Sequence, residues 1–292
     1  MIRDLMAVLR EAFDLSACEE TAFEANPTDA PRYGVFRALG FGRISIGAQS
    51  LDDRELAWLG RDHDAAGVRE AVRAARAAGF PSLGLDLIYG LPGQTPEGWE
   101  RTLEGALALG PEHVSVYALT LTGGKRLPGP PLPSEGWQAE MAAAAMDRLE
   151  AAGIVQYEIS NFARAGHESR HNLAYWTFRP YLGLGPSAHS YLAPRRFSNV
   201  AQTPEYVERV LAGKPATGME ETLTQPQVDL ERLFLGLRLS EGVEASRVPA
   251  GEAEALRREG FLSLQGGRVF LTRQGRPVAD AVIGRLVGAG VR

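Results

Sequence analysis

Four short apolar runs, set apart by helical patterns and turns, constrain the fold of this chain more than any other feature. The runs are residues 21–25, 43–48, 83–88 and 113–119. Helical patterns cover 64–78 and 96–109, and Gly79 and Gly110 stand where a glycine commonly ends a helix. Strands separated by helices of this length cannot form hairpins, so they should pair in parallel. We predict an α/β fold, with an open or closed β/α barrel favoured over a doubly wound sheet.

The flanking segments add a helix before these strands and a mixed region after them. Apolar residues recur at helical spacing in 1–13. A Gly- and Pro-rich loop at 122–136 precedes a predicted helix at 137–152 and a fifth strand at 155–159. Residues 161–199 are rich in His, aromatic residues and Gly and show neither period, which indicates an ordered functional insert.

The last third resembles a winged-helix-like α+β domain in the order of its elements. Thr203-Pro204-Glu205 predicts a helix with a hydroxyl cap. A helix, a hairpin turning at Gly266-Gly267 and a final helix follow, at residues 252–259, 261–271 and 277–287. Acidic and basic residues are mixed here, which favours packing or partner contact over DNA binding. We predict a barrel, an insert and a C-terminal domain over 1–160, 161–202 and 203–292.

Composition limits the setting and the chemistry. The formal net charge of −5, from 31 basic and 36 acidic residues, provides no global field for nucleic acid or an anionic bilayer. No signal peptide or transmembrane segment is apparent, so we expect a cytoplasmic protein. Cys18 is the single cysteine, so this chain forms no internal disulfide and no thiolate cluster. It precedes the first strand, at the end opposite a barrel site, and we interpret it as structural.

Polar side chains occur in the last part of each of the four predicted strands or directly after it, at the end where β/α folds bind ligands. They are Glu24 and Asn26, Gln49 and Ser50, Asp86 and Tyr89, and Tyr117 and Thr120. Glu24 and Asp86 suit ribose hydroxyls or an ammonium group, and Gln49 offers both a donor and an acceptor.

Two groups near these strand ends have a structural interpretation as well as a functional one. One of Ser50, Asp52 and Asp53 is suited to cap the next helix or to contact a ligand. Arg61 and His63 are suited to pair with a ligand carboxylate or to stay solvated.

The insert contains a candidate haem ligand in the run His171-Asn172-Leu173-Ala174-Tyr175-Trp176. A neutral imidazole is a good axial ligand for haem iron, and flat aromatic rings pack against a porphyrin face. A histidine among aromatic residues is also commonly a hydrogen-bonded structural residue. The residues alone leave both roles open for His171.

Several motifs, in order, resemble the radical S-adenosylmethionine (SAM) proteins related to oxygen-independent coproporphyrinogen III oxidase. They are Phe23-Glu24-Ala25-Asn26-Pro27, the run 43–50 and the run 86–95. The run 157–163, followed by His171-Asn172 and Tyr175-Trp176, resembles the branch of haem chaperones called HemW. The likeness spans nearly the whole chain.

The resemblance implies a partial TIM-like radical SAM barrel that binds SAM, in a protein that binds haem and transfers it to acceptor proteins, including any at the membrane surface. By this resemblance, the SAM-binding positions of the family correspond to Glu24, Gln49, Arg61 and Asp86. The neighbouring strand-end candidates are Asn26, Ser50 and Tyr89. The haem motif implies contact through His171, as iron ligand, with Asn172, Tyr175 and Trp176. The alternatives are an oxygen-independent coproporphyrinogen III oxidase of porphyrin biosynthesis and a winged-helix binding protein.

The chain departs from the family at the iron site. Relatives carry a C-x-x-x-C-x-x-C loop whose three thiolates bind a [4Fe–4S] cluster, and this chain has neither that loop nor the first barrel strands. We expect no reductive SAM cleavage by the chain as written, and the enzyme assignment stays open. A start codon assigned too late is favoured over a cluster-free relic, because missing strands would expose an unpaired sheet edge. A second departure lies at Thr122-Gly123-Gly124-Lys125, where relatives usually have a glutamate and then threonine.

Overall fold

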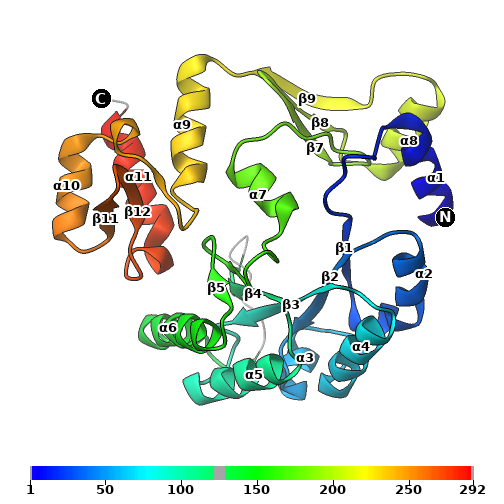
Figure 1. Cartoon of the computed structure of the whole chain (residues 1–292), viewed down its shortest axis with the longest axis horizontal. Helices are drawn as coiled ribbons and strands as arrows, with labels where there is room; N and C mark the ends of the chain where they lie inside the picture. The colour runs from blue at the N-terminus through cyan, green and yellow to red at the C-terminus, as the bar shows by residue number, and fades with distance from the viewer. Residues whose placement is uncertain (1, 122–128, 291–292) are drawn as a thin grey trace. The chain divides into compact units, whose positions relative to one another are not determined.

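The protein forms two compact units, residues 1–168 and 169–292, in a computed structural model that describes residues 2–121 and 129–290 (Figure 1). The boundary after Glu168 falls inside the predicted insert. The division into three regions stays a prediction. The departure noted at residues 122–125 lies outside the described residues.

A six-stranded sheet forms the centre of the first unit, in the order β1-β2-β3-β4-β6-β5. Strands β1 to β4 run parallel, as predicted. The strands are Ala22–Ala25, Arg43–Gln49, Ser82–Tyr89, His113–Ala118, Val155–Gln156 and Asn161–Ala163. The predicted fifth strand at 155–159 is wrong in extent. The chain turns after β5, where the Tyr157 amide donates to the Asn161 carbonyl at 3.1 Å, and β6 returns antiparallel to β4.

The first unit contains the predicted helices and, between β1 and β2, two short helices that were not predicted, η1 (Pro27–Arg32) and α2 (Tyr33–Ala38). The others are α1 (Ile2–Ala12), α3 (Asp53–Trp58), α4 (Ala65–Ala77), α5 (Pro96–Ala108) and α6 (Glu135–Ala151). Gly79 and Gly110 have φ values of 81° and 67°, which confirms the left-handed stops predicted for α4 and α5.

The two faces of the parallel sheet differ in chemistry because side chains alternate along each strand. One face contributes Phe23, Ile44, Leu85 and Val114 to the apolar core, on the side where α4, α5 and α6 lie (Figure 1). Trp99 of α5 is fully buried there, and its indole N–H donates to the Met141 carbonyl of α6 at 2.8 Å. Packing the helices on the apolar face leaves the polar side chains together on the other face.

The second unit contains two three-stranded antiparallel sheets, β7-β8-β9 and β10-β12-β11. The strands are His189–Leu192, Arg195–Asn199, Thr217–Thr222, Val243–Glu244, Leu262–Gln265 and Arg268–Leu271 for β7 to β12. The helices are α7 (Arg170–Trp176), α8 (Thr203–Leu211), α9 (Gln225–Gly236), α10 (Ala250–Arg258) and α11 (Ala279–Gly290), with short 3₁₀ turns η2 (Ala245–Arg247) and η3 (Arg276–Val278).

This unit confirms the predicted C-terminal order of helix, hairpin and helix. Gly266 and Gly267 both have positive φ at the turn between β11 and β12. The predicted hydroxyl cap on α8 is wrong, because Thr203 is itself helical and Gln202 stands at the cap position without a side-chain hydrogen bond. No helix in the described parts of the chain is long and apolar enough to cross a membrane.

Candidate functional site

Asp86 lies at the centre of the polar face of the first unit. The register pairs Glu24 with Ser45 and Asp86 with Ser115, and the Ser45 hydroxyl donates to Asp86 Oδ1 at 2.9 Å. Burial raises the pKa of the Asp86 carboxyl, against the hydrogen bonds from Ser115 and Ser45, and the negative charge of Glu24 raises it further. The structure thus brings two carboxylates together where a cationic or hydroxyl-bearing ligand would stabilise their charge.

Gln49, Arg61 and Asn26 meet beside this group, around Gly47. Gln49 has a left-handed φ of 63°, at a shift in the register between β2 and β3. Arg61 Nη2 donates to Asn26 Oδ1 at 2.8 Å. A Cβ on Gly47 would lie 2.9 Å from Gln49 Nε2 and 3.3 Å from Arg61 Nη2. The buried Arg61 Nε has no acceptor among the described residues, so the Arg61 side chain retains a hydrogen-bond donor for a ligand.

A cavity of about 830 Å³ lies beside Arg61, on the η1 and α4 side. Pro27, Thr28 and His63 line it with Arg61. The described residues that line it do not include Glu24, Gln49 or Asp86, so this cavity is not the predicted strand-end site.

Ser50 and Tyr89 lie behind the polar face and have structural partners. Ser50 is fully buried, and its hydroxyl donates to Glu55, which also accepts from Gln94 Nε2 at 3.0 Å. Gln94 Oε1 in turn accepts from the Gly90 amide at 2.7 Å, so Ser50 supports the turn after β3. Tyr89 packs against Trp99, with ring centroids 5.7 Å apart.

The predicted helix cap is confirmed at Asp52, whose carboxylate accepts from the Arg54 amide at 2.8 Å at the start of α3. His63 is almost fully buried in its side chain, and its Nε2 lies 3.3 Å from the Ala48 carbonyl, next to Gln49. His63 is therefore not solvated, and its ring contacts the backbone of β2 next to Gln49.

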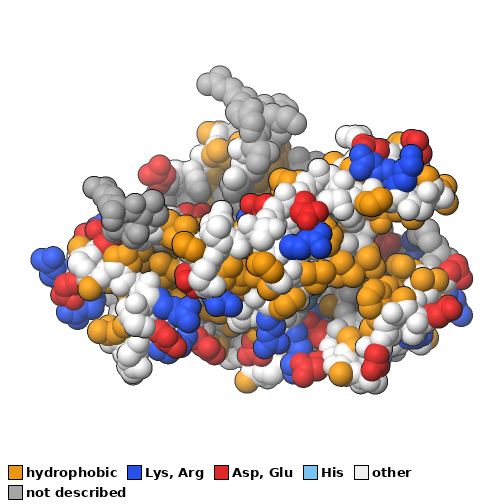
Figure 2. Space-filling model, turned by 90° about the horizontal axis from the view of Figure 1, so that it is seen from above, with side chains coloured by type: hydrophobic (Ala, Val, Ile, Leu, Met, Phe, Trp, Pro, Cys, Tyr) orange, Lys and Arg blue, Asp and Glu red, His pale blue; other side chains and the backbone are white. Residues whose placement is uncertain are grey.

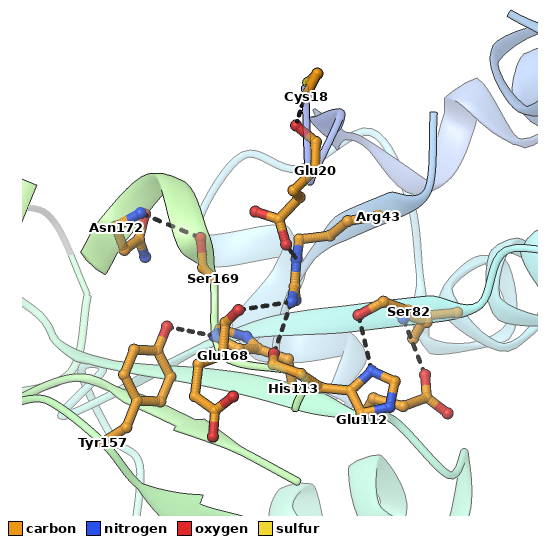
Figure 3. A network of polar contacts seen from close by, with 12 residues as sticks. Cys18, Glu20, Arg43, Ser82, Glu112, His113, Tyr157, Glu168, Ser169 and Asn172 are labelled. Atoms are coloured by element: carbon orange, nitrogen blue, oxygen red, sulfur yellow. Dashed lines mark hydrogen bonds and ion pairs between the residues drawn. The ribbon is translucent and has the colours of Figure 1, made fainter. Parts of the chain in front are cut away.

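Figure 3 shows a polar network that the sequence did not reveal, centred on the buried Arg43. Its guanidinium pairs with Glu20 at 2.7 Å and donates to the carbonyls of His167 and Glu168 at 2.7 and 3.0 Å. Cys18 Sγ lies 3.3 Å from the Glu20 carbonyl oxygen and donates to it. Arg43 thereby fixes the last residues of the first unit, immediately before α7.

His113 and His167, which had no evident partners in the sequence, belong to the same region. His113 Nε2 lies 2.9 Å from the Tyr157 hydroxyl, and His167 Nδ1 lies 3.3 Å from Ser82 Oγ. Burial, with smaller contributions from its electrostatic interactions with Arg43 and His167, lowers the pKa of His113 to about 3.

The free energy of unfolding should fall as the pH drops from the ordinary histidine value of 6.5 to about 3. In this window the unfolded chain protonates His113 and the folded chain does not, so the loss reaches about 1.4 kcal/mol per pH unit from this group. Urea unfolding at several pH values measures it. The His113→Asn variant should show a shallower pH slope, and an unchanged slope would contradict a neutral buried His113.

Helix α7 presents His171 at the surface of the second unit. Ser169 caps the helix by accepting from the Asn172 amide at 3.3 Å. The His171 ring is exposed and stacks edge-on against Tyr175, with ring centroids 4.8 Å apart. The ring centroids of Tyr175 and Tyr181 are 4.5 Å apart. The ring nitrogens of His171 have no hydrogen-bond partner in the described part of the chain. This imidazole is therefore available to a ligand.

The residues of the predicted haem motif do not all lie on one face of α7. His171 and Tyr175 share a face of α7, whereas Trp176 lines a cavity within the second unit. Asn172 is half-buried, with its backbone amide used in the cap. Only His171 and Tyr175 are exposed members of the motif.

Comparisons with known proteins bear on this arrangement. Residues 3–106 match the radical SAM superfamily, and residues 223–278 match the HemN C-terminal domain. The chain is 37% identical over 304 residues to the heme chaperone HemW of Bacillus subtilis (strain 168), covering 96% of this chain and 78% of that protein. This chain belongs to the HemW family of radical SAM proteins. The heme chaperone HemW of Mycobacterium tuberculosis (strain ATCC 25618 / H37Rv) is also 37% identical, over 97% of this chain and 76% of its own length.

The family and fold predicted from the motifs are thus confirmed. The structure of the coproporphyrinogen III oxidase HemN from Escherichia coli, a radical SAM enzyme, matches 98% of this chain and 73% of its own chain with a TM-score of 0.84. At 22% sequence identity this likeness shows the fold alone.

The residues of this chain do not fit the [4Fe–4S] cluster that the superfamily implies. Such a cluster needs cysteine thiolates, and Cys18 is the only cysteine in the sequence. Among the described residues, no group of three His, Cys, Asp or Glu side chains is arranged to hold a metal ion.

Proposed function

We propose that this protein binds haem through His171 on α7 and transfers it to acceptor proteins. The observation that carries the proposal is the exposed His171 imidazole, which has no hydrogen-bond partner in the described part of the chain. Its ring stacks edge-on against Tyr175. A neutral imidazole of this kind is a suitable axial ligand for haem iron. Relatives named heme chaperone HemW, at 37% identity, support the proposal.

An exposed ligand also suits transfer rather than permanent storage. A haem held at the surface of α7 remains accessible to a second protein, whereas a haem enclosed in a core would not. An absorbance titration of the chain with haem tests the binding step. Saturation at one haem per chain with a shifted Soret band is expected, and absorbance that rises without saturation would contradict a defined site.

We further propose that the strand ends of the first unit bind SAM, with Glu24, Asn26, Gln49, Arg61 and Asp86 as contacts. When bound, SAM supplies a ribose, an ammonium and a carboxylate. The carboxylates of Glu24 and Asp86 suit the first two groups, and the orphan Arg61 Nε suits the third. The absence of a side chain at Gly47 supports close approach of such a ligand to the backbone of β2. Ser50 and Tyr89 are better explained as supports behind these contacts.

The Gly47→Ala variant should lose SAM affinity by about tenfold, because the added methyl displaces the Gln49 amide and the Arg61 guanidinium. Isothermal titration calorimetry with SAM measures the change. Gly34→Ala is the matched control, since a Cβ there meets nothing within 4 Å, and it should bind SAM as the unaltered chain does. Equal affinities for both variants would argue against a site around Gly47.

Two arginines of the winged-helix-like segment pair with carboxylates. Arg257 of α10 pairs with Glu254, and Arg285 of α11 pairs with both Glu252 and Glu259. On the face drawn in Figure 2, acidic and basic side chains are interspersed. The pairing of Arg257 and Arg285 with carboxylates supports packing or partner contact as the role of the winged-helix-like segment.

A further inference from the structure

A second cavity, of about 220 Å³, lies wholly within the second unit. It is lined by residues of α7, α9, β10, η2 and β12, with Trp176 and Arg232 on the first two of these elements. Glycines shape it. A Cβ on Gly236 would lie 2.6 Å from Val243 Cγ1, and Gly242 has a φ of 61° with the Val269 carbonyl oxygen only 2.0 Å from its would-be Cβ. These positions let α9, β10 and β12 approach closely enough to enclose the cavity.

The charge in this cavity is strongly unbalanced. Three arginines, Arg232, Arg247 and Arg268, line it with one acidic residue, Glu244. Glu244 lies 3.6 Å from Arg247, and Arg268 donates to the carbonyls of residues 241 and 242. Arg232 has no carboxylate partner among the described residues, and its guanidinium lies over the Phe178 ring at 5.8 Å. The excess positive charge remains for a ligand to balance.

Arg232 supplies hydrogen-bond donors to the cavity, since a guanidinium donates and accepts no hydrogen bonds. The Trp176 side chain also lines the cavity, and its buried indole N–H has no acceptor in the described part of the chain. A group that brings oxygen acceptors and negative charge would pair with Arg232 and lie beside the Trp176 ring.

We propose that this cavity is an oxyanion-binding site for a carboxylate or phosphate group. Its volume is smaller than the roughly 300–1,000 Å³ typical of whole-ligand pockets, so it holds a small anion or the anionic end of a larger molecule. Where the oxyanion is a haem propionate, the site deepens the proposed function and rests on it. Where it is a free anion, the site stands apart from His171.

The Trp176 indole N–H provides a direct readout. The chain has four tryptophans, so a ¹⁵N-labelled sample gives few indole resonances, and Trp176→Phe assigns the relevant one. Because Trp176 lines the cavity, titration with inorganic phosphate or acetate should shift this resonance saturably. Arg232→Gln should weaken the apparent affinity at least about tenfold, because it removes a charge-assisted partner while breaking no hydrogen bond of the fold. Arg257→Gln, on α10 and paired with Glu254, is the matched control and should behave as the unaltered chain.

Titrations with haem, with haem dimethyl ester and with phosphate identify the source of the oxyanion. A shift caused by haem but not by haem dimethyl ester assigns the site to a propionate, and a shift caused by phosphate but not by haem assigns it to a free anion. The phosphate arm does not depend on haem binding, so a failure of the haem proposal leaves it intact. A Trp176 resonance that no probe moves at tens of millimolar, or one that moves equally in Arg232→Gln, overturns the proposal.

Discussion

The His171→Ala variant should bind haem at least about tenfold more weakly than the unaltered chain, equivalent to about 1.4 kcal/mol, and lose the imidazole-ligated Soret band. His171 is exposed, and Ala is well tolerated in a helix, so the change removes the iron ligand without disturbing α7. Loss of the ring also removes the edge-on partner of Tyr175. Equilibrium titration followed at the Soret band measures both effects.

The matched control is His189→Ala, which removes another exposed imidazole from the same unit. It should leave affinity and spectrum unchanged, because haem binding in this account depends on α7. If His189→Ala and His171→Ala weakened binding equally, the affinity would reflect non-specific attraction to surface histidines, and the assignment to α7 would be wrong.

The Arg43→Leu variant should lower the free energy of unfolding of the first unit by about 3–5 kcal/mol, the usual cost of breaking a buried ion pair from one side. Arg43 is buried and binds Glu20 and two backbone carbonyls that lie more than 120 residues away in sequence (Figure 3). The substitution leaves these acceptors in a region with little water. Urea unfolding monitored by tryptophan fluorescence and circular dichroism measures the loss.

Arg73→Ala serves as the comparison for Arg43→Leu. Arg73 pairs with Glu70 on α4, but both side chains are more than half exposed, so its removal should cost less than about 1 kcal/mol. A loss for Arg43→Leu no larger than that for Arg73→Ala would show that the Arg43 network does not hold the fold together.

Local patterns predicted the scaffold because they depend on neighbouring residues. The apolar runs at β1 to β4, the stops at Gly79 and Gly110 and the hairpin at Gly266-Gly267 each follow from residue spacing or from glycine conformation. The strand-end residues Glu24 and Asp86 also converge as predicted, since parallel strands bring their carboxyl ends to one edge.

Contacts between distant segments could not be predicted in this way. The partners of Arg43 are 23 to 125 residues away, and no periodicity links them. The network of Ser50, Glu55 and Gln94 likewise joins the end of β2, α3 and the turn after β3. Because these contacts are not visible in the sequence, the sequence favours a helix cap or a ligand contact for Ser50.

The surroundings of Trp176 also depend on contacts between distant segments. Helix geometry turns residue i+5 away from residue i, so Trp176 and His171 lie on different faces of α7. Trp176 lines a cavity together with Arg232 of α9, which is 56 residues away in sequence.

Ligation of haem iron by His171 on α7 can be observed by pulsed hyperfine spectroscopy of the ferric haem complex of the full chain with ¹⁵N-labelled histidine. We expect a coupling from one protein imidazole nitrogen that disappears in His171→Ala and persists in His189→Ala. A complex whose imidazole coupling survives in His171→Ala, or that never shows one, would contradict it.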